Sequence, residues 1–256
     1  MTATPSPSLH ALLLLSDSAL PLGSFAFSSG LESFLAHNKT RHSTSSSKTR
    51  AFETFLEHSL ANVASTALPY VLAAYHDDPT LDRLEELDND FDASTPCTVA
   101  RRASTTQGRA LLAIWERALS TSVSPSPDSQ AAAKVLSAFA TASKTSKPDV
   151  YGLQINAHFP PLFGLTCRAL ALSEAETAYL FLLNHAKALL SAGVRASVLG
   201  PYQSQAVLAS ARLQECIKTC IKLQDGRQVE DASVTAPVMD LWMGRHELLY
   251  SRIFNS

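Results

Sequence analysis

The stretch Ser173–Leu190, SEAETAYLFLLNHAKALL, indicates the fold class of this chain. Ser173 and Glu176 have the spacing of a helix capping box, and the apolar residues that follow predict a helix. The apolar character continues over 178–194. Three polar side chains interrupt it, at Asn184, His185 and Lys187. Because a bilayer would penalise these side chains, we predict a helix that is buried in a protein core and does not span a membrane.

The composition extends this helical pattern to the whole chain. The 256 residues are 46% hydrophobic and include only 9 glycines. Alanine and leucine recur at helical spacing, and alternating runs of β-branched residues are nearly absent. A chain of this length buries a substantial core. We predict an all-α protein, a single globular multi-helix domain over residues 1–256 with Ser/Pro-rich loop inserts.

Charge and cysteine usage restrict the partners and the compartment. With 21 Lys and Arg residues against 23 Asp and Glu residues, the formal net charge is -2, which creates no field that attracts nucleic acid. The four cysteines do not form the dense framework of a small secreted domain. No Lys or Arg precedes the apolar run 11–15, and Asp17 follows it closely, so it does not resemble a secretory signal. These features predict a cytoplasmic protein with reduced thiols.

The N-terminal residues predict two short helices around a tight turn. A first helix covers Leu9–Leu15, and Pro21-Leu22-Gly23 follows it as a turn. Ser29 and Glu32 then have capping-box spacing, which predicts a second helix toward His37.

Apolar spacing and prolines place the next helices. Apolar residues three and four apart predict a helix over 52–63. Pro69 lacks a backbone donor and should kink this helix or start another, which ends at His76–Pro79. Pro96 is predicted at the first position of a further helix that continues to Leu119.

Three Ser-rich segments predict loops, near 40–49, 121–129 and 141–148. The first is rich in Ser, Thr and basic residues. Because burial of such side chains contributes little favourable free energy, we expect a mobile loop. The other two contain prolines and are predicted to be exposed inserts. Gly200-Pro201 separates the apolar helix from an amphipathic helix that ends near Ile221.

The sequence lacks the common patterns of enzymatic catalysis. A G-x-S-x-G nucleophile elbow, a G-x-x-x-x-G-K-[ST] phosphate loop and a G-x-G-x-x-G fingerprint are all absent. We therefore predict no catalytic residue and no hydrolysis of GTP or ATP by this chain. A helical hydrolase that uses Ser24 or Cys97 stays open as an alternative, although neither residue has a recognisable motif context.

The cysteines and histidines do not predict a metal site. Cys216 and Cys220 are four residues apart on a predicted helix, a spacing that puts both on one side. Two thiols without a third ligand are better explained as small buried side chains. The eight histidines are scattered, without an H-E-x-x-H pair. We predict that no residue of this chain forms a diagnostic metal site.

The stretch Leu12–Leu35, LLLLSDSALPLGSFAFSSGLESFL, resembles the opening motif of the urease accessory protein F family. In that motif a leucine-rich helix leads into S-x-x-x-L-P-x-G-x-F-x-x-S-x-G-L-E. The matching positions are Ser16, Leu20, Pro21, Gly23, Phe25, Ser28, Gly30, Leu31 and Glu32.

Two later blocks resemble the same family in the same order. Val194-Arg195 with Leu199-Gly200 and Gln203 is similar to its V-R-x-x-x-L-G-Q region, with Pro201-Tyr202 as a local departure. The final segment, Pro237–Ser256, is similar to a closing R-H-E-x-x-Y-S-R-L-F-x-S. The resemblance thus spans nearly the whole chain, interrupted by the two Ser/Pro-rich inserts.

This resemblance implies a function without chemistry of its own. It implies an all-α homodimer that binds urease accessory protein D, called H in some organisms, and through that complex recruits the GTPase urease accessory protein G. The assembly would deliver nickel to apo-urease, with this chain as a scaffold and regulator of the GTPase and with no cofactor of its own. Direct carriage of nickel by this chain is the alternative.

The matching blocks contain the candidate residues for partner binding. Turn residues serve both folding and recognition, and protein interfaces favour arginine and aromatic residues. The candidates are Pro21, Gly23, Phe25, Ser28, Gly30, Glu32, Arg195, Gln203, Arg245, His246, Tyr250, Arg252 and Phe254. Those within 237–256 are expected to form a docking tail that stays mobile until accessory protein D binds it.

Overall fold

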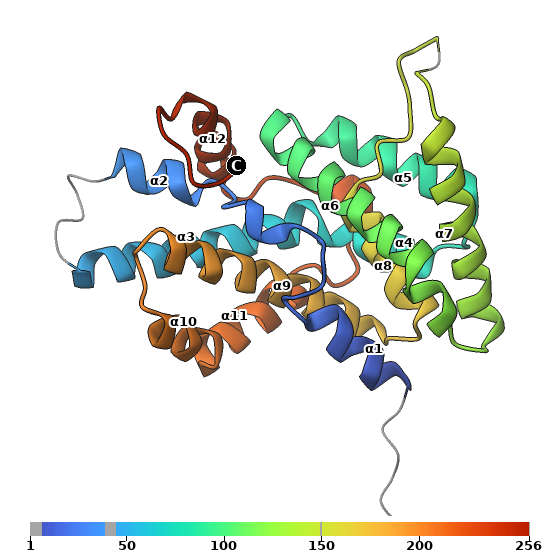
Figure 1. Cartoon of the computed structure of the whole chain (residues 1–256), viewed down its shortest axis with the longest axis horizontal. Coiled ribbons are helices and arrows are strands. Elements are labelled where there is room, and N and C mark those ends of the chain that lie inside the picture. Colours follow the sequence, from blue (N-terminus) through green and yellow to red (C-terminus); the bar gives the residue numbers. More distant parts are fainter. Residues whose placement is uncertain (1–6, 39–44, 149, 256) are drawn as a thin grey trace, which may run out of the picture. The chain divides into compact units, whose positions relative to one another are not determined.

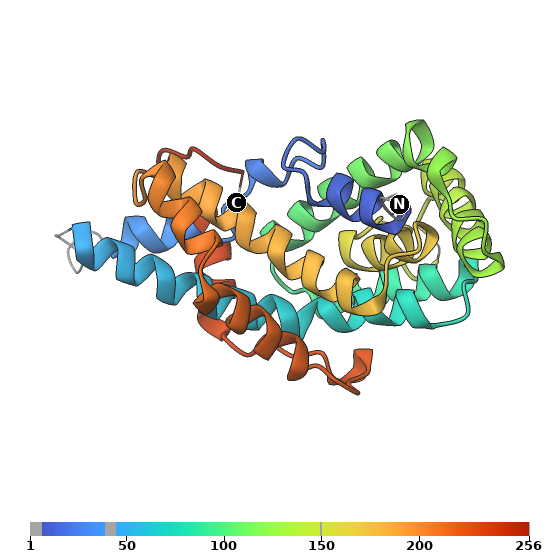
Figure 2. The ribbon, with the colours of Figure 1, turned by 90° about the horizontal axis from the view of Figure 1, so that it is seen from below.

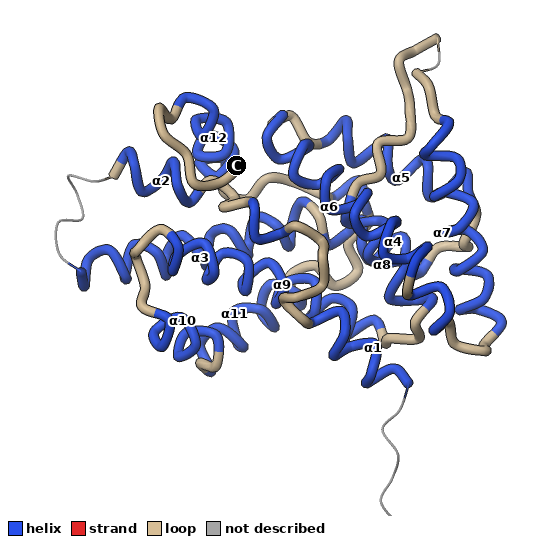
Figure 3. The backbone as a smooth tube through the Cα atoms, in the orientation of Figure 1, coloured by secondary structure: helices blue, strands red, loops and turns tan. Residues whose placement is uncertain are grey.

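The computed structural model describes residues 7–38, 45–148 and 150–255. Within these residues the chain folds into α-helices joined by turns and short 3-10 helices, with no strand (Figures 1 and 3). The predicted all-α class is therefore confirmed. The α-helices are α1 (Pro7–Ser16), α2 (Leu31–His37), α3 (Ser45–Thr66), α4 (Leu68–His76), α5 (Leu81–Ser94), α6 (Thr98–Arg117), α7 (Pro127–Thr145), α8 (Phe159–Ala169), α9 (Glu174–Arg195), α10 (Pro201–Leu208), α11 (Ala211–Lys222) and α12 (Pro237–Arg245). The 3-10 helices are η1 (Ser24–Ala26), η2 (Leu119–Ser122), η3 (Val229–Asp231) and η4 (His246–Leu248).

The chain divides into two compact units. The first unit contains the described residues up to Leu22 together with 67–96 and 104–181. The second unit contains the described residues of 23–66, 97–103 and 182–256. Helices α6 and α9 therefore each contribute residues to both units. The expectation of a single domain over 1–256 stays a prediction.

A glycine brings α4 and α8 together in the first unit. A Cβ atom on Gly164 of α8 would lie 2.0 Å from the carbonyl oxygen of Val71 in α4. Only glycine therefore lets the two backbones approach this closely. Helices α5 and α7 pack around the same pair. The indole of Trp115 in α6 is buried, and its N–H donates to Ser137 Oγ of α7 at 3.3 Å.

A buried carboxylate fixes the segment that leads into α8. The side chain of Asp88 in α5 accepts backbone N–H bonds from Asn156, Ala157 and His158 at 2.7, 3.1 and 2.6 Å. Burial raises the pKa of Asp88, and these hydrogen bonds oppose the rise. The buried ring of His158 also contacts Ser104 Oγ at 3.0 Å. These bonds satisfy polar groups that would otherwise be buried without partners.

The second unit is built around α3. The ring of Phe52 in α3 lies against Gly193 of α9, where an added Cβ atom would be 2.7 Å from a ring carbon. Helix α11 packs along α3, and α12 packs against both α2 and α3 (Figures 1 and 2). The half-buried His185 of α9 bonds through Nε2 to Ser59 Oγ of α3 at 2.8 Å.

The boundaries of several helices differ from the sequence-based expectations. Helix α3 begins at Ser45, so the second half of the predicted loop 40–49 is helical, while 40–44 lies outside the described residues. Helix α6 begins at Thr98, so Pro96 precedes this helix and does not open it. Helix α5 was not predicted, because its apolar positions alternate with many acidic residues.

Serine caps account for two further differences. Ser126 Oγ accepts the N–H of Ser129, which starts α7 within the predicted insert 121–129, and the helix continues into the predicted insert 141–148 as far as Thr145. Ser210 Oγ accepts the N–H of Leu213, which divides the predicted amphipathic helix into α10 and α11.

The capping box before α9 is confirmed. The N–H of Glu176 donates to Ser173 Oγ at 3.3 Å, and the Glu176 carboxylate accepts the N–H of Ser173 at 2.7 Å. Of the helices that the structure describes, none combines the length and the apolar character of a membrane span.

The stability of the fold should fall in mild acid because the surroundings of His185 disfavour its charged form. Burial lowers the pKa of His185 from 6.5 to about 4. The unfolded chain therefore binds one more proton between these pH values, and the free energy of unfolding should decrease by about 1.4 kcal/mol per pH unit as the pH falls through this window. We measure the free energy of unfolding by urea denaturation at a series of pH values from 7 to 4. In the variant His185→Gln this free energy should fall less steeply with decreasing pH, by the equivalent of about one proton. Equal slopes for the two proteins would contradict this assignment.

Candidate functional site

Two left-handed residues shape the turn before α2. Ser29 has a φ of 51° and Gly30 a φ of 85°, conformations that cost little only for glycine. At Gly30 an added Cβ atom would also lie 3.0 Å from both Trp242 Cβ and Met243 N of α12. The opening motif therefore uses a glycine where the backbone of α2 meets the C-terminal helix.

Glu32 binds the C-terminal segment instead of capping its own helix. The predicted capping box of Ser29 and Glu32 is wrong, since Gly30 is the N-cap residue and no side chain caps α2 at this position. The Glu32 carboxylate instead accepts the N–H of Ile253 at 2.7 Å and the N–H of Phe254 at 3.2 Å. Hydrogen bonds to a charged carboxylate are roughly twice as strong as neutral ones. A residue near one end of the chain thus fixes the backbone of the other end.

His246 closes the C-terminal segment on itself. Its ring is fully buried, and Nε2 donates to the carbonyl oxygen of Phe254 at 3.0 Å. Its Nδ1 lies 3.8 Å from Glu32 Oε2 and has no hydrogen-bond partner among the described residues. Burial lowers the pKa of His246, although the Phe254 carbonyl and the Glu32 carboxylate oppose this effect. The neutral ring is therefore favoured in the folded protein.

Arg195 holds the aromatic side chain of the segment. Its guanidinium lies over the ring of Phe254, with 4.4 Å from Cζ to the ring centroid, and it donates to the carbonyl oxygen of Phe25. The N–H of Asn255 donates to the carbonyl oxygen of Ala26 at 2.8 Å. Phe254 is only 4% exposed. A cation–π contact that is partly shielded from water contributes about 1 to 2 kcal/mol.

Arg102 also contacts the C-terminal segment, which the motifs did not predict. It lies near the start of α6, donates to the carbonyl oxygen of Asn255 at 2.8 Å and forms an ion pair with Glu247. Arg252 pairs with the same carboxylate at 2.8 Å. The two guanidinium groups lower the pKa of Glu247. Arg102 lies in none of the matching blocks, so only the folded chain reveals this contact.

Helix α12 is joined to α2 by aromatic rings. The indole of Trp242 meets the ring of Phe34 edge-on, with ring centroids 5.7 Å apart, and lies 5.7 Å from the ring of His37. Arg245 Nε donates to His37 Nε2 at 3.1 Å. Upstream of α12, the side-chain oxygen of Asn62 accepts two backbone N–H bonds. The described part of 237–256 is thus packed against its own unit, contrary to the expectation of a mobile tail.

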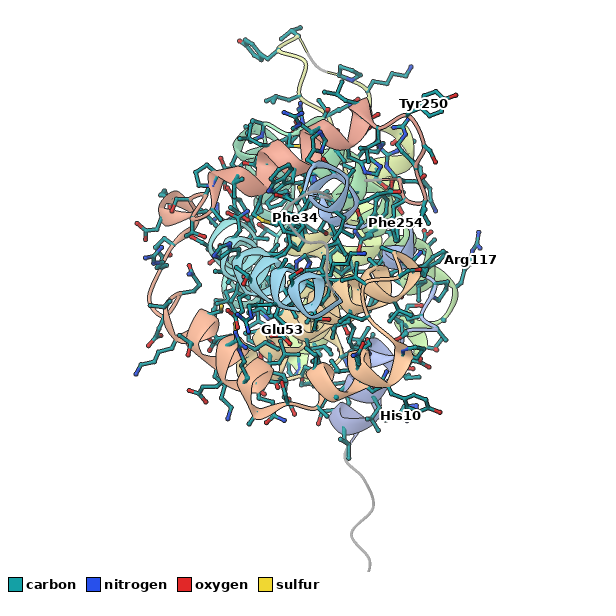
Figure 4. The ribbon with its side chains drawn as sticks, turned by 90° about the vertical axis from the view of Figure 1, so that its left-hand side faces the viewer. His10, Phe34, Glu53, Arg117, Tyr250 and Phe254 are labelled. Carbon is teal, nitrogen blue, oxygen red and sulfur yellow. The ribbon has the colours of Figure 1, made fainter. Side chains whose placement is uncertain are left out.

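Several side chains of the C-terminal segment point outward. Tyr250 is fully exposed and extends away from the ribbon, whereas Phe254 is buried (Figure 4). Leu248 and Ile253 are also exposed, and Arg252 is half-exposed on its side chain. We call Leu248, Tyr250, Arg252 and Ile253 the tail surface. Exposed aromatic and arginine side chains are of the types that protein interfaces favour.

Comparisons with known proteins show what the chain is similar to. A family model described as UreF matches residues 47–212. The chain is 40% identical over 247 residues to a Schizosaccharomyces pombe protein described as urease accessory protein UreF-like, with 96% of this chain and 97% of that protein covered.

The chain belongs to the UreF family. It is also 30% identical over 242 residues to urease accessory protein F of Arabidopsis thaliana, with 94% of this chain and 89% of that protein covered. A Cryptococcus neoformans protein named urease accessory protein 6 is 27% identical over 314 aligned positions, with 97% of each chain covered. Membership of the UreF family gives this chain a role in urease maturation.

The predicted partner-binding residues of this UreF-family chain divide into two groups. One group meets at the C-terminal segment and consists of Phe25, Ser28, Gly30, Glu32, Arg195, Arg245, His246, Tyr250, Arg252 and Phe254. Within it, Ser28 Oγ is buried and accepts the N–H of Glu32 at 3.4 Å.

The other three residues have separate local roles. Pro21 is exposed and belongs to the first unit. Gly23 has a φ of 74° and precedes η1, in open space. The Gln203 side chain accepts the N–H of Gly200 at 2.9 Å and so caps α10. Partner binding by the thirteen residues stays a prediction.

Proposed function

We propose that this chain is a non-enzymatic scaffold in urease maturation that helps to assemble a nickel-delivery complex. In this proposal the protein is a cytoplasmic homodimer that binds urease accessory protein D, also called H. Through that complex it recruits and regulates the GTPase urease accessory protein G, and the assembly delivers nickel to apo-urease. The UreF-family membership supports the place of the chain in this process.

The tail surface is the observation that carries the proposal. Glu32, Arg195 and Arg102 hold the segment from Glu247 to Asn255 in one conformation, so its outward side chains are presented without a large ordering cost on binding. Tyr250 and Arg252 belong to the residue types that dominate binding energy in protein interfaces. We propose that accessory protein D binds this surface.

The alternative hypothesis of a helical hydrolase depends on Ser24 and Cys97. The positions of these two residues favour the scaffold proposal. Ser24 lies within the short 3-10 helix η1, and the thiol of Cys97 is buried. Neither residue lies in the sequence motif of a known nucleophile. The chain also lacks a phosphate-loop motif, so we expect the purified protein to show no GTP turnover.

Nickel is proposed to be handled by the complex and not by a resident site in this chain. Among the described residues, no group of three or more His, Cys, Asp or Glu side chains could hold a metal ion. A titration of the isolated protein with nickel separates the scaffold from a direct carrier, because a carrier should bind about one equivalent tightly.

Replacing both Cys216 and Cys220 with alanine should leave urease activation largely intact. Cys220 is buried and Cys216 is half-buried on α11, so we assign both to packing and not to nickel ligation. Urease activity should be measured in a strain that carries the double variant at limiting nickel. Loss of activation with an unchanged melting temperature would support direct nickel carriage instead.

Deletion of the gene tests the proposed function. The deletion strain should contain urease protein of normal abundance that is inactive at limiting nickel, and the wild-type gene should restore activity. Full urease activity in the deletion strain would contradict a role in maturation.

A further inference from the structure

A groove in the first unit lies between α6 and α7. It has a volume of about 550 Å³, and the segment that leads into α8 also lines it, through Ile155 and Ala157. The residues that line it from α6 recur at spacings of three and four, and they are Arg109, Leu112, Ala113, Glu116 and Arg117. Those from α7 have the same spacing and are Ala140, Ser143 and Lys144. Such spacing puts the residues on one face of each helix, so two helix faces form the walls.

The backbone at Ala157 is held in place by the groove's own surroundings. Ala157 has a φ of 63°, a left-handed conformation that is uncommon for a residue with a Cβ atom. Its N–H donates to the Asp88 carboxylate at 3.1 Å. A Cβ atom on Gly108 of α6 would lie 2.0 Å from the Ala157 carbonyl oxygen, so α6 packs directly on this backbone. The groove therefore has a fixed wall, which lowers the ordering cost of binding.

The groove carries an excess of positive charge. Lys144 of α7 forms an ion pair with Glu116 of α6 at 2.5 Å, so these two charges compensate each other. Among the residues that the structure describes, neither Arg109 nor Arg117 has a hydrogen bond or an ion pair. Both side chains are exposed, and Arg117 extends away from the ribbon (Figure 4). Two uncompensated guanidinium groups therefore attract carboxylates or phosphates.

The spacing of the two arginines favours an elongated ligand. Arg109 and Arg117 are eight residues apart on α6, so their side chains leave the helix about 12 Å apart along its axis. This separation suits several negative groups along a chain better than one small anion. An extended peptide rises about 3.3 Å per residue, so about four residues span the distance. Leu112 and Ile155 supply apolar surface for the aliphatic part of glutamate side chains.

An exposed loop adjoins the groove at Ile155. Ser146 Oγ accepts the N–H of Ile155 at 2.8 Å and so joins the two ends of this loop. Val150, Tyr151 and Leu153 are 92%, 84% and 54% exposed. Figure 1 shows the described part of the loop extending away from the helices. Tyrosine is a residue type that protein interfaces favour, so the loop offers an apolar contact beside the charged groove.

We propose that this groove binds an extended acidic segment of a partner protein. Carboxylates of the segment pair with Arg109 and Arg117, and an apolar side chain of the segment packs on Tyr151. The site belongs to the first unit and is separate from the tail surface, which belongs to the second. Because the whole chain has a formal net charge of -2, it does not attract acidic peptides in general, and binding depends on this local charge.

Fluorescence anisotropy of the full-length protein tests this proposal with a labelled peptide of six glutamates and one leucine. At low ionic strength the double variant Arg109→Gln, Arg117→Gln should bind about tenfold more weakly than the wild type. Lys218→Gln, Lys222→Gln removes the same charge from exposed positions of α11 and is the matched control, with binding unchanged. Tyr151→Ser should weaken binding of this peptide several-fold but leave binding of hexaglutamate without leucine unchanged.

Photocross-linking locates the site on the wild-type protein, whether or not a variant folds. A benzophenone on the same peptide should give products within 109–117, 140–144 or 150–157. Circular dichroism of each variant shows whether it is folded.

Several results would overturn the proposal. Absence of binding by the wild type, equal losses in the two double variants, or cross-links confined to other segments would each show that the groove does not select acidic peptides. Displacement of the peptide by inorganic phosphate, but not by sodium chloride of equal ionic strength, would indicate a site for a small anion instead. Tighter binding of a hexathymidylate oligonucleotide than of the peptide would indicate nucleic acid as the ligand.

Discussion

Removal of residues 237–256 is expected to lower the melting temperature by about 10 °C or more. The deletion takes away Met239 and Phe254, which are 3% and 4% exposed, and the indole of Trp242 that packs on α2. Loss of one large core side chain typically costs about 3 kcal/mol or more, and each kcal/mol shifts the melting temperature of a chain of this size by about 2 to 4 °C.

Thermal melts followed by circular dichroism measure this effect. The exposed substitution Tyr250→Ser is the matched control and should leave the melting temperature within about 1 °C, since surface changes typically cost less than 0.5 kcal/mol. An unchanged melting temperature after truncation would show that the segment does not support its own unit. That result would restore the hypothesis of a mobile docking tail.

The substitution Glu32→Ala should release the end of the chain while most of the fold remains. It leaves the N–H groups of Ile253 and Phe254 without their charged acceptor, and bonds of this type contribute about 1.5 to 3 kcal/mol each. We therefore expect amide hydrogen exchange over 246–255 to accelerate at least tenfold, with α9 and α11 little affected.

Hydrogen exchange with mass spectrometry measures the release directly. Glu215→Ala, a change at an exposed glutamate of α11, is the matched control and should not alter exchange in the segment. Uniform acceleration throughout the second unit would argue that Glu32 stabilises the whole unit. Unchanged exchange at 246–255 would contradict the assigned role of its carboxylate.

Local signals predicted the helices that have clear ends. The capping box at Ser173 and Glu176 and the proline at the start of α4 both act over a few residues, so they are readable in the sequence. The same reasoning failed at Ser45–Thr49, where a Ser- and Thr-rich segment is helical as the first part of α3. Propensity is a weak prior that packing overrides.

The candidate site depends on contacts that no local pattern contains. The residues of the opening and closing motifs were found, but the bonds of Glu32 to Ile253 and Phe254 join positions more than 200 residues apart. Their spacing in the sequence predicted a helix cap instead. The role of Arg102 could not be predicted from the sequence. Nothing in the residues around an arginine near a helix start indicates that it pairs with a residue far away in the chain.

The central claim is that the tail surface, held by its own unit, binds a partner within the urease accessory complex. The double variant Leu248→Ser, Tyr250→Ser removes two exposed side chains and leaves the buried contacts of Glu32 and Arg195 in place. Tyr202→Ser changes an equally exposed tyrosine on α10 in the same unit and is the matched control.

The decisive measurement is the affinity of each folded variant for accessory protein D, with the melting temperature of the same samples. If the two side chains are interface anchors worth about 2 kcal/mol each, the double variant should bind on the order of several hundred-fold more weakly, with its melting temperature and the binding of Tyr202→Ser unchanged. Wild-type affinity in the folded double variant would contradict the claim that this surface binds accessory protein D.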